Sequence, residues 1–381
     1  MQHTPENLLE RSRTIKRELV RLSDEALERH PVLKRNDAIG FAVMYGSVAA
    51  IVAAAVAYSR GVLPAWCVIL SSAFFMAFIH DIEHDLLHRL YFQKRRWLYN
   101  LSMVLAWVFR PSSINPWVRR DWHMHHHRAS GTASDVEERG LLNGERWGVR
   151  RAVMSLDPLL AILLRPITIR DMLLSYAAVQ KPSERLRARI RNMSAHTPLA
   201  NLNAIATVWV LYLHVAPWAC GLVGSHYEMS ATSAAALPTL DFLAVTLIVP
   251  NAWRTFCLYF VSSNLHYYGD IDPKNIIQQA QTWDAWWTMP FQLFCCYFGG
   301  THFIHHFAVQ YPFYMRFVIM RDAHRVLRAH GARFNDFDNM RRANRWELSG
   351  NTAPQHTFGA SILASAAAHT TNVSSVADAA E

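Results

Sequence analysis

The chain has 381 residues, of which 51% are hydrophobic and only 18% are charged. Soluble domains usually carry about 25% charged residues, and several apolar runs here approach the roughly 20 residues that cross a bilayer. The composition therefore excludes an ordinary soluble protein and indicates an integral membrane protein. The formal net charge is +9, but about half of the lysines and arginines lie between Arg89 and Arg191. That asymmetry is typical of cytoplasmic loops, so we expect no nucleic acid partner.

The N-terminal region, residues 1–37, is polar and shows no secretory signal pattern. Its stretch ERSRTIKRELVRLSDEALERH, at 10–30, predicts a charged amphipathic helix on the cytoplasmic surface of the protein or the membrane. At the other end, residues 351–381 are rich in Ala, Ser and Thr, and we expect them to be disordered. Residues 38–350 are expected to form one membrane-bound domain.

Four apolar segments of this domain are long enough to cross the bilayer and pair as two hairpins. The predicted spans lie near residues 38–59, 62–83, 203–224 and 237–263. Two apolar pieces of the intervening polar region, 97–109 and 153–164, are too short to span. We therefore predict an all-α fold with four transmembrane helices and a cytoplasmic helical cap. The expected location is a bacterial inner membrane or its equivalent, with both termini in the cytoplasm.

Histidines gather in three segments near the predicted cytoplasmic boundary: HDIEHDLLH at 80–88, HMHHH at 123–127 and HFIHH at 302–306. They recur at spacings of three and four residues, which bring rings together on one face of a helix. A single histidine on an apolar face is most often a hydrogen-bonded core residue. Three such groups at one boundary instead indicate a shared metal site. The five cysteines form no CxxC pair, so thiolate ligation is not supported.

The number of histidines indicates which metal chemistry to expect. Imidazole-rich sites suit zinc, copper, iron and nickel. A structural zinc ion needs only four ligands, so eight or more convergent histidines predict two metal ions. In a membrane and without thiolates, two such ions favour oxygen chemistry on iron over hydrolysis. A membrane metal transporter or metal-binding protein is the alternative class, although transport would place ionisable ligands at mid-membrane depth.

The ordered histidine segments resemble the membrane fatty acid desaturase and hydroxylase superfamily, in which three histidine boxes hold a non-haem di-iron centre. The matching boxes are HDLLH at 84–88, HMHHH at 123–127 and HFIHH at 302–306, and the stretches HRLYFQKRRWLYN, TWDAWW and NLHYYG also resemble family members. The resemblance covers roughly residues 38–315. It implies metal ligands at His84, His88, His123, His126, His127, His266, His302, His305 and His306, with His80, His125 and Asn264 as further candidates.

Charged residues flank the three boxes. Because metal-bound imidazoles usually donate their second N–H to a carboxylate or carbonyl, we expect supporting roles for Asp81, Asp85, Asp135, Glu137, Glu138 and Asp270. Three arginines beside the second box either hold the anionic head group of a substrate or simply follow the charge bias of cytoplasmic loops. They are Arg119, Arg120 and Arg128.

The resemblance implies two iron ions, O2 and a fatty acid or fatty acyl substrate that is oxidised at an unactivated C–H bond. Desaturation is the expected reaction. Hydroxylation of an acyl chain or alkane remains open, as does decarboxylation to a terminal alkene, because the stretch HHRASGTASDVEERG is similar to a bacterial subgroup that includes such decarboxylases. The sequence contains no HPGG haem-binding stretch, so we expect an external electron donor such as ferredoxin or rubredoxin, with its reductase.

Overall fold

The computed structural model describes residues 5–156, 173–174 and 176–347. Regular structure in these residues is helical, and extended chain pairs there only at two isolated bridges. The predicted all-α fold is thereby confirmed. The tail predicted to be disordered, residues 351–381, lies outside the described residues, as does most of the apolar piece 153–164.

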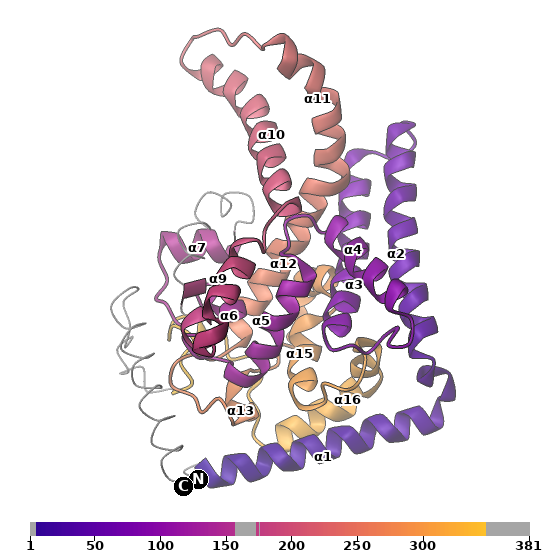
Figure 1. Ribbon diagram of the computed structural model, residues 1–381, viewed down its shortest axis with the longest axis vertical. Helices are drawn as coiled ribbons and strands as arrows, with labels where there is room; N and C mark the ends of the chain where they lie inside the picture. Colours follow the sequence, from indigo (N-terminus) through magenta and orange to yellow (C-terminus); the bar gives the residue numbers. More distant parts are fainter. Residues whose placement is uncertain (1–4, 157–172, 175, 348–381) are drawn as a thin grey trace.

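Within the described residues, four helices are long and apolar enough to cross a membrane. They are α2 (Asn36–Ser59), α3 (Ala65–Leu87), α10 (Leu199–Leu222) and a continuous helix over Ala231–Leu265. Figure 1 shows them as the two predicted hairpins. The last helix begins earlier than the predicted span 237–263, because Ser230 caps it by accepting the N–H of Ser233 on its hydroxyl oxygen.

The last of these helices changes its hydrogen-bonding pattern halfway along. It consists of α11 (Ala231–Leu243), a π-helical turn (Ala244–Ile248) and α12 (Val249–Leu265). The N–H of Val249 donates to the carbonyl of Ala244, five residues back. Pro250 follows, and a proline has no N–H to donate and clashes with the carbonyl four residues earlier. The wider turn accommodates the proline without ending the helix.

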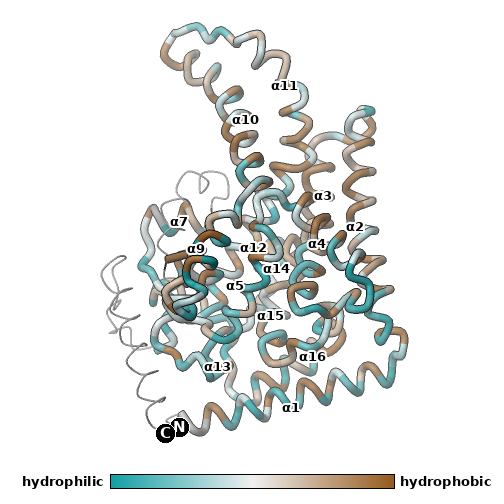
Figure 2. The backbone as a smooth tube through the Cα atoms, in the orientation of Figure 1, coloured by the Kyte–Doolittle hydropathy of each residue, from teal (hydrophilic) through white to brown (hydrophobic). Residues whose placement is uncertain are grey.

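The two hairpins differ in how much protein covers them. The helices α2 and α3 pack on each other, and α4 (Arg96–Val108) packs on α3. The helices α10 and α11 instead project beyond the rest of the molecule (Figure 1), and Figure 2 shows α10 as predominantly hydrophobic. Its exposed apolar residues are Leu202, Ile205, Val208, Val215, Trp218 and Leu222. Such a surface is suited to contact with lipid.

Shorter helices form a cap at the other end of the hairpins. They are α5 (Pro116–Ala129), α6 (Val136–Arg139), α7 (Val149–Leu156), α9 (Arg185–Met193), α13 (Ile276–Gln279), α14 (Met289–Gln292), α15 (Phe298–Phe307) and α16 (Phe313–Ala329). Figure 1 shows α1 (Pro5–Arg29) running along the base of this cap.

The first helix buries an apolar face against α13, α15 and α16. The buried residues recur at helical spacing and are Leu8, Ile15, Leu19, Leu22 and Ala26. Burying a large aliphatic side chain stabilises a fold by about 1.5–3 kcal/mol. The amphipathic N-terminal helix is therefore an integral part of the cap.

Candidate metal centre

The predicted ligands converge from four helices between the hairpins and the cap. The last turn of α3 and the residue after it contribute His84 and His88. Three histidines come from each of α5 and α15, and His266 directly follows the last residue of α12. His266 leaves the helical conformation, with φ −94° and ψ 145°, and forms an isolated bridge with Ala280. The end of α12 is thus held against the residue that directly follows α13.

Local signals fix both ends of α5. Asn115 caps its start by accepting the N–H of Trp117 on Oδ1 at 3.0 Å, and Pro116 occupies the first helical position. Beyond its end, Gly131 has a φ of +75°, and an added Cβ would lie 2.7 Å from the carbonyl oxygen of Tyr267. Only glycine fits this turn, which brings the acidic segment back alongside α5.

The orientation of α15 is set by the two residues before it. The backbone of Cys296 and Tyr297 is left-handed, with φ of 47° and 52°. Residues other than glycine rarely adopt this conformation unless tertiary contacts impose it. They turn the chain from the short helices around α14 into α15. All residues from Gly299 to Phe307 are buried, so the histidines of this helix point into protein.

Five histidines form a first cluster, in which one ring nitrogen from each lies within 4.8 Å of all the others: His84, His88, His123, His127 and His305. The Nε2 of His88 lies 2.9 Å from that of His123 and 3.0 Å from that of His305. The Nε2 of His127 lies 3.1 Å from those of His123 and His305. Three distant segments thus direct their Nε2 atoms toward one point.

Four buried histidines form a second cluster by the same criterion: His126, His266, His302 and His306. The Nε2 of His302 lies 3.1 Å from that of His266 and 3.0 Å from that of His306. The two clusters are neighbours, because the ring centroids of His127 and His306 are only 5.2 Å apart. The nine histidines therefore form one centre with two halves.

The second and third histidine boxes each contribute to both halves, whereas His84 and His88 of the first box both enter the first cluster. His123 and His127, four residues apart, enter the first cluster, while His126 between them enters the second. His302 and His306 likewise share a cluster, whereas His305 enters the other. An α-helix advances by about 100° per residue, so residues four apart differ in direction by about 40° and adjacent residues by about 100°. The histidines of each of these helices, which the spacing predicted to share one face, are thus divided between the two clusters.

Three side chains fix the tautomers of three histidines by accepting a hydrogen bond from Nδ1. Glu137 accepts from His123 at 2.8 Å, and Asp135 accepts from His126 at 2.9 Å. The amide oxygen of Gln279 accepts from His306 at 2.9 Å, since its amide nitrogen donates to a carbonyl instead. A proton on Nδ1 leaves a lone pair on Nε2, so these three rings present an acceptor to the centre of their cluster.

These ring nitrogens fit a cation in each cluster. Lone pairs that converge at hydrogen-bond distance cannot satisfy one another without a proton or a metal ion between them. Burial lowers the pKa of His123, His127, His305 and His306, which keeps the rings in the neutral form that binds metals. Sets of five and four imidazoles suit iron, copper, zinc or nickel. The residues present therefore fit a pair of transition-metal ions.

Three sequence candidates lie outside both clusters. The Nε2 of His80 accepts a hydrogen bond from Arg119 at 3.1 Å, which occupies its lone pair. The Nε2 of His125 lies 2.9 Å from the hydroxyl of Ser134. The side-chain nitrogen of Asn264 donates to a main-chain carbonyl one turn earlier at 2.7 Å. The structure thus separates these three residues from the nine that it brings together.

Two acidic residues of α3 lie beside the centre. Asp85 accepts a hydrogen bond from Arg316 of α16 at 3.0 Å, and its carboxylate lies 3.6 Å from Nδ1 of His84. It therefore joins α3 to the cap next to a cluster histidine. Asp81 is also buried and pairs with the thiol of Cys296, at the turn that leads into α15.

The remaining acidic candidates behave differently. Asp270 accepts the main-chain N–H groups of Trp346 at 2.7 Å and Glu347 at 2.9 Å and contacts none of the clustered histidines. The side chain of Glu138 lies outside those that the structure describes.

Sequence reasoning missed Gln279, because an amide among polar residues gives no signal of its role.

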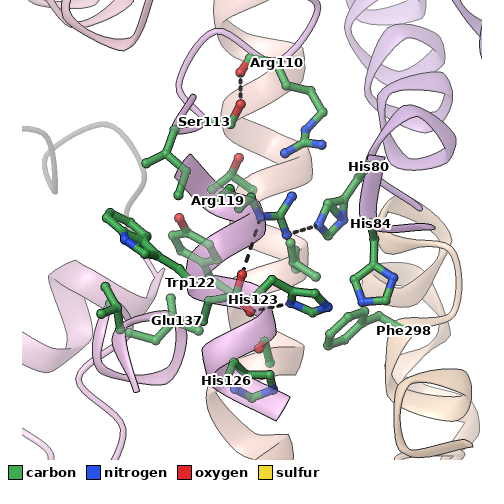
Figure 3. Close-up of a pocket in the computed structure, with 18 of the residues that line it drawn as sticks. His80, His84, Arg110, Ser113, Arg119, Trp122, His123, His126, Glu137 and Phe298 are labelled. Atoms are coloured by element: carbon green, nitrogen blue, oxygen red, sulfur yellow. Dashed lines mark hydrogen bonds and ion pairs between the residues drawn. The ribbon is translucent and has the colours of Figure 1, made fainter. Parts of the chain in front are cut away.

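A pocket of about 210 Å³ opens beside both clusters (Figure 3). From the first cluster it is lined by His84 and His123, and from the second by His126, His266 and His302. Figure 3 shows His84 and Phe298 on one side of this pocket and Trp122 on the other. Further apolar residues on its walls are Ile114, Val136, Leu141, Leu258 and Tyr259. An apolar ligand in this pocket would lie against both halves of the centre.

The three arginines proposed to hold a head group differ in position. Arg119 lines the pocket, whereas Arg120 and Arg128 do not. Arg119 also donates to the carboxylate of Glu83 at 2.5 Å, so its charge has a partner within the protein.

Sequence reasoning missed two further arginines that line the pocket, Arg110 and Arg254. Both are buried, with 2% and 3% of the residue exposed. Arg254 had a usable signal, because it lies inside the apolar segment predicted as a span, and an ionisable residue there is a functional candidate by default.

One comparison with known proteins supports this geometry. A comparison with proteins of curated function finds no match to the chain. The family model described as fatty acid desaturase matches residues 60–338, which is well over half of the chain. The matched region contains all nine clustered histidines and the residues that line the pocket. The chain therefore belongs to the fatty acid desaturase family.

Proposed function

We propose that the protein is an O2-dependent di-iron oxidoreductase that introduces a double bond into a fatty acyl chain. Family membership supports an oxidoreductase that acts on fatty acyl groups. The observation that carries the proposal is the pocket lined by histidines of both clusters. An alkyl chain in this pocket would have its C–H bonds beside both metal positions, which is the placement that such an oxidation needs.

We assign the nine clustered histidines as the ligands of the two iron ions. Bound iron would supply the O2-activating chemistry that an unactivated C–H bond requires, with two electrons from a donor. The protein's own residues hold the ligands: Glu137, Asp135 and Gln279 fix the tautomers of three of them. The apolar walls, including Trp122 and Phe298, keep water from the reacting carbon atoms.

A second groove supports an acidic electron donor as partner. It is lined by four arginines, Arg89, Arg96, Arg120 and Arg191, and by the partly exposed cluster residue His88. Of these arginines, Arg191 pairs with Asp121 at 2.5 Å. A basic groove that reaches a metal ligand complements an acidic carrier such as ferredoxin or rubredoxin, which its reductase would recharge. We propose that this groove faces the cytoplasm, together with both termini.

The proposed location is a bacterial inner membrane or its equivalent. The four long apolar helices and the exposed apolar surface of α10 support it, and the basic residues around the cap support a cytoplasmic orientation of the centre.

The test combines metal analysis with product analysis. The purified protein should contain about two irons per chain, and gas chromatography with mass spectrometry of lipids and headspace from an expressing host should show a new double bond that depends on O2. A hydroxylated chain would instead identify the reaction as hydroxylation, and a volatile terminal alkene would identify it as decarboxylation. Reversible zinc or copper uptake without turnover would contradict an enzyme and favour a transporter.

A further inference from the structure

Arg254 is a buried cation that the metal centre does not use. It lies in α12, within the last long apolar helix, and it lines the pocket with 3% of the residue exposed. Its Nη2 donates to the hydroxyl oxygen of Thr255 at 2.9 Å. Its Nε and Nη1 have no hydrogen-bond partner among the described residues. Its donors are therefore available to a ligand in the pocket.

The carboxylates around the pocket are already engaged by other groups. Glu83 accepts hydrogen bonds from both Arg110 and Arg119. Glu137 is hydrogen-bonded to a cluster histidine and lies 3.6 Å from Arg119. Three guanidinium groups thus line the pocket against two carboxylates, and Arg254 is the one that pairs with no carboxylate among the described residues. An uncompensated charge buried in an apolar helix is costly unless it serves a ligand.

We propose that Arg254 binds the carboxylate of the substrate, so that the protein acts on an unesterified fatty acid. This inference rests on the proposed function, because it names the substrate class for the same pocket. The planar guanidinium group matches the two oxygens of a carboxylate and retains its charge at any physiological pH. Thr255 also lines the pocket, and its hydroxyl group, which accepts from Arg254, still has a proton to donate.

The charge of the head group decides between substrate classes. A fatty acid brings one negative charge and would neutralise the guanidinium of Arg254. The carbonyl groups of a thioester or a glycerolipid ester are neutral and would leave that charge uncompensated in a buried site. The apolar walls of the pocket accept the alkyl chain of all three classes equally well. Discrimination between them therefore falls on Arg254.

The experiment measures binding by the full chain in detergent, without turnover. Radiolabelled saturated fatty acids from dodecanoate to octadecanoate are the probes, and their methyl esters and coenzyme A thioesters are the competitors. For the wild-type protein, we expect the acid to compete far better than its methyl ester. Arg254→Gln should weaken binding of the acid by roughly 30-fold or more and leave binding of the methyl ester unchanged. Arg254→Lys should restore part of the loss.

Controls separate head-group binding from general damage. Arg187→Gln removes an exposed arginine of α9 that does not line the pocket and should change nothing. Iron content and melting temperature report whether each variant is folded. Equal binding of acid, ester and thioester by the wild-type protein would overturn the inference even if Arg254→Gln does not fold. Absence of oxidised product despite Arg254-dependent binding would instead contradict the proposed function.

Discussion

The Nε2 atoms of His127 and His305 lie 3.1 Å apart, although 178 positions separate the two residues in the chain. His127 belongs to α5 and His305 to α15, so this contact joins the second and third histidine boxes inside the first cluster. Neighbouring residues on the same helices, His126 and His306, meet across the second cluster. The proposed metal centre therefore depends on the rotation of two helices about their axes, and its ligands can be tested one residue at a time.

The consecutive residues His125, His126 and His127 offer a matched comparison. His126→Ala and His127→Ala each remove a ligand from one cluster, and we expect iron content to fall from about two to about one per chain or less. Product formation should fall by more than about 100-fold, because loss of even a supporting residue costs 10–100-fold. His125 contacts Ser134 instead, so His125→Ala should retain both irons. Equal loss of iron from all three variants, measured by plasma emission spectrometry, would refute the ligand assignment.

Glu137 should act through His123, whose Nδ1 donates to it at 2.8 Å. Removing this acceptor in Glu137→Ala frees the imidazole to rotate and to change tautomer, and we expect a roughly 10–100-fold loss of metal affinity or activity. Glu137→Gln keeps an acceptor oxygen and should lose less.

Asp270 provides the contrast for this prediction. It accepts main-chain N–H groups of Trp346 and Glu347, so Asp270→Asn should lower the melting temperature while the folded protein keeps its iron. A metal titration followed by absorbance and a thermal melt distinguish the two effects. Iron loss from Asp270→Asn without any change in stability would show that the residue supports the centre after all.

The sequence allowed the fold and the gathering of the histidines to be predicted because their signals are local. Apolar runs of about 20 residues need only hydrophobicity to be recognised, and the four long helices confirm them. Histidine spacing predicted rings that face the same way, and the structure brings nine of them together. The assignment of each ring to one half of the centre depends on how α3, α5 and α15 are rotated against one another. That rotation is set by long-range packing, which spacing does not encode.

Other features were missed for reasons specific to each residue. Gln279 supports His306 through an amide oxygen, and nothing in its neighbourhood marks it as different from a surface glutamine. Asp270 resembles a supporting carboxylate because it follows His266 closely, yet the chain turns its side chain toward Trp346. Arg254 could have been recognised from the sequence, because a charged side chain in an apolar helix is energetically unfavourable and usually has a function. The arginines beside the second histidine box gave a stronger local signal, because they adjoin predicted ligands.

The basic groove beside His88 predicts a dependence on salt and on charge. Arg89 and Arg96 are exposed residues of this groove, so Arg89→Glu and Arg96→Glu should lower kcat/KM for a protein electron donor by repelling its acidic surface. Rising ionic strength should weaken the wild-type reaction in the same direction, because surface charges are screened over about 10 Å at 0.1 M salt. A small chemical reductant needs no docking surface and should reduce wild-type and variant proteins equally. Slower reduction of the variants by both donors would locate the defect in the metal centre and contradict a docking role.

Removal of metal should loosen the cap, because the clusters connect α3, α5, α15 and the end of α12. A ligand that binds only the folded state stabilises it by about 2.7 kcal/mol when its concentration is 100 times its Kd, and two sites would add. Chelation should therefore lower the melting temperature by several degrees, and added Fe(II) should restore it. The double variant His126→Ala/His127→Ala removes one ligand from each cluster and should respond much less to the chelator. An unchanged melting temperature after proven loss of iron would mean that protein packing alone holds the nine histidines in place.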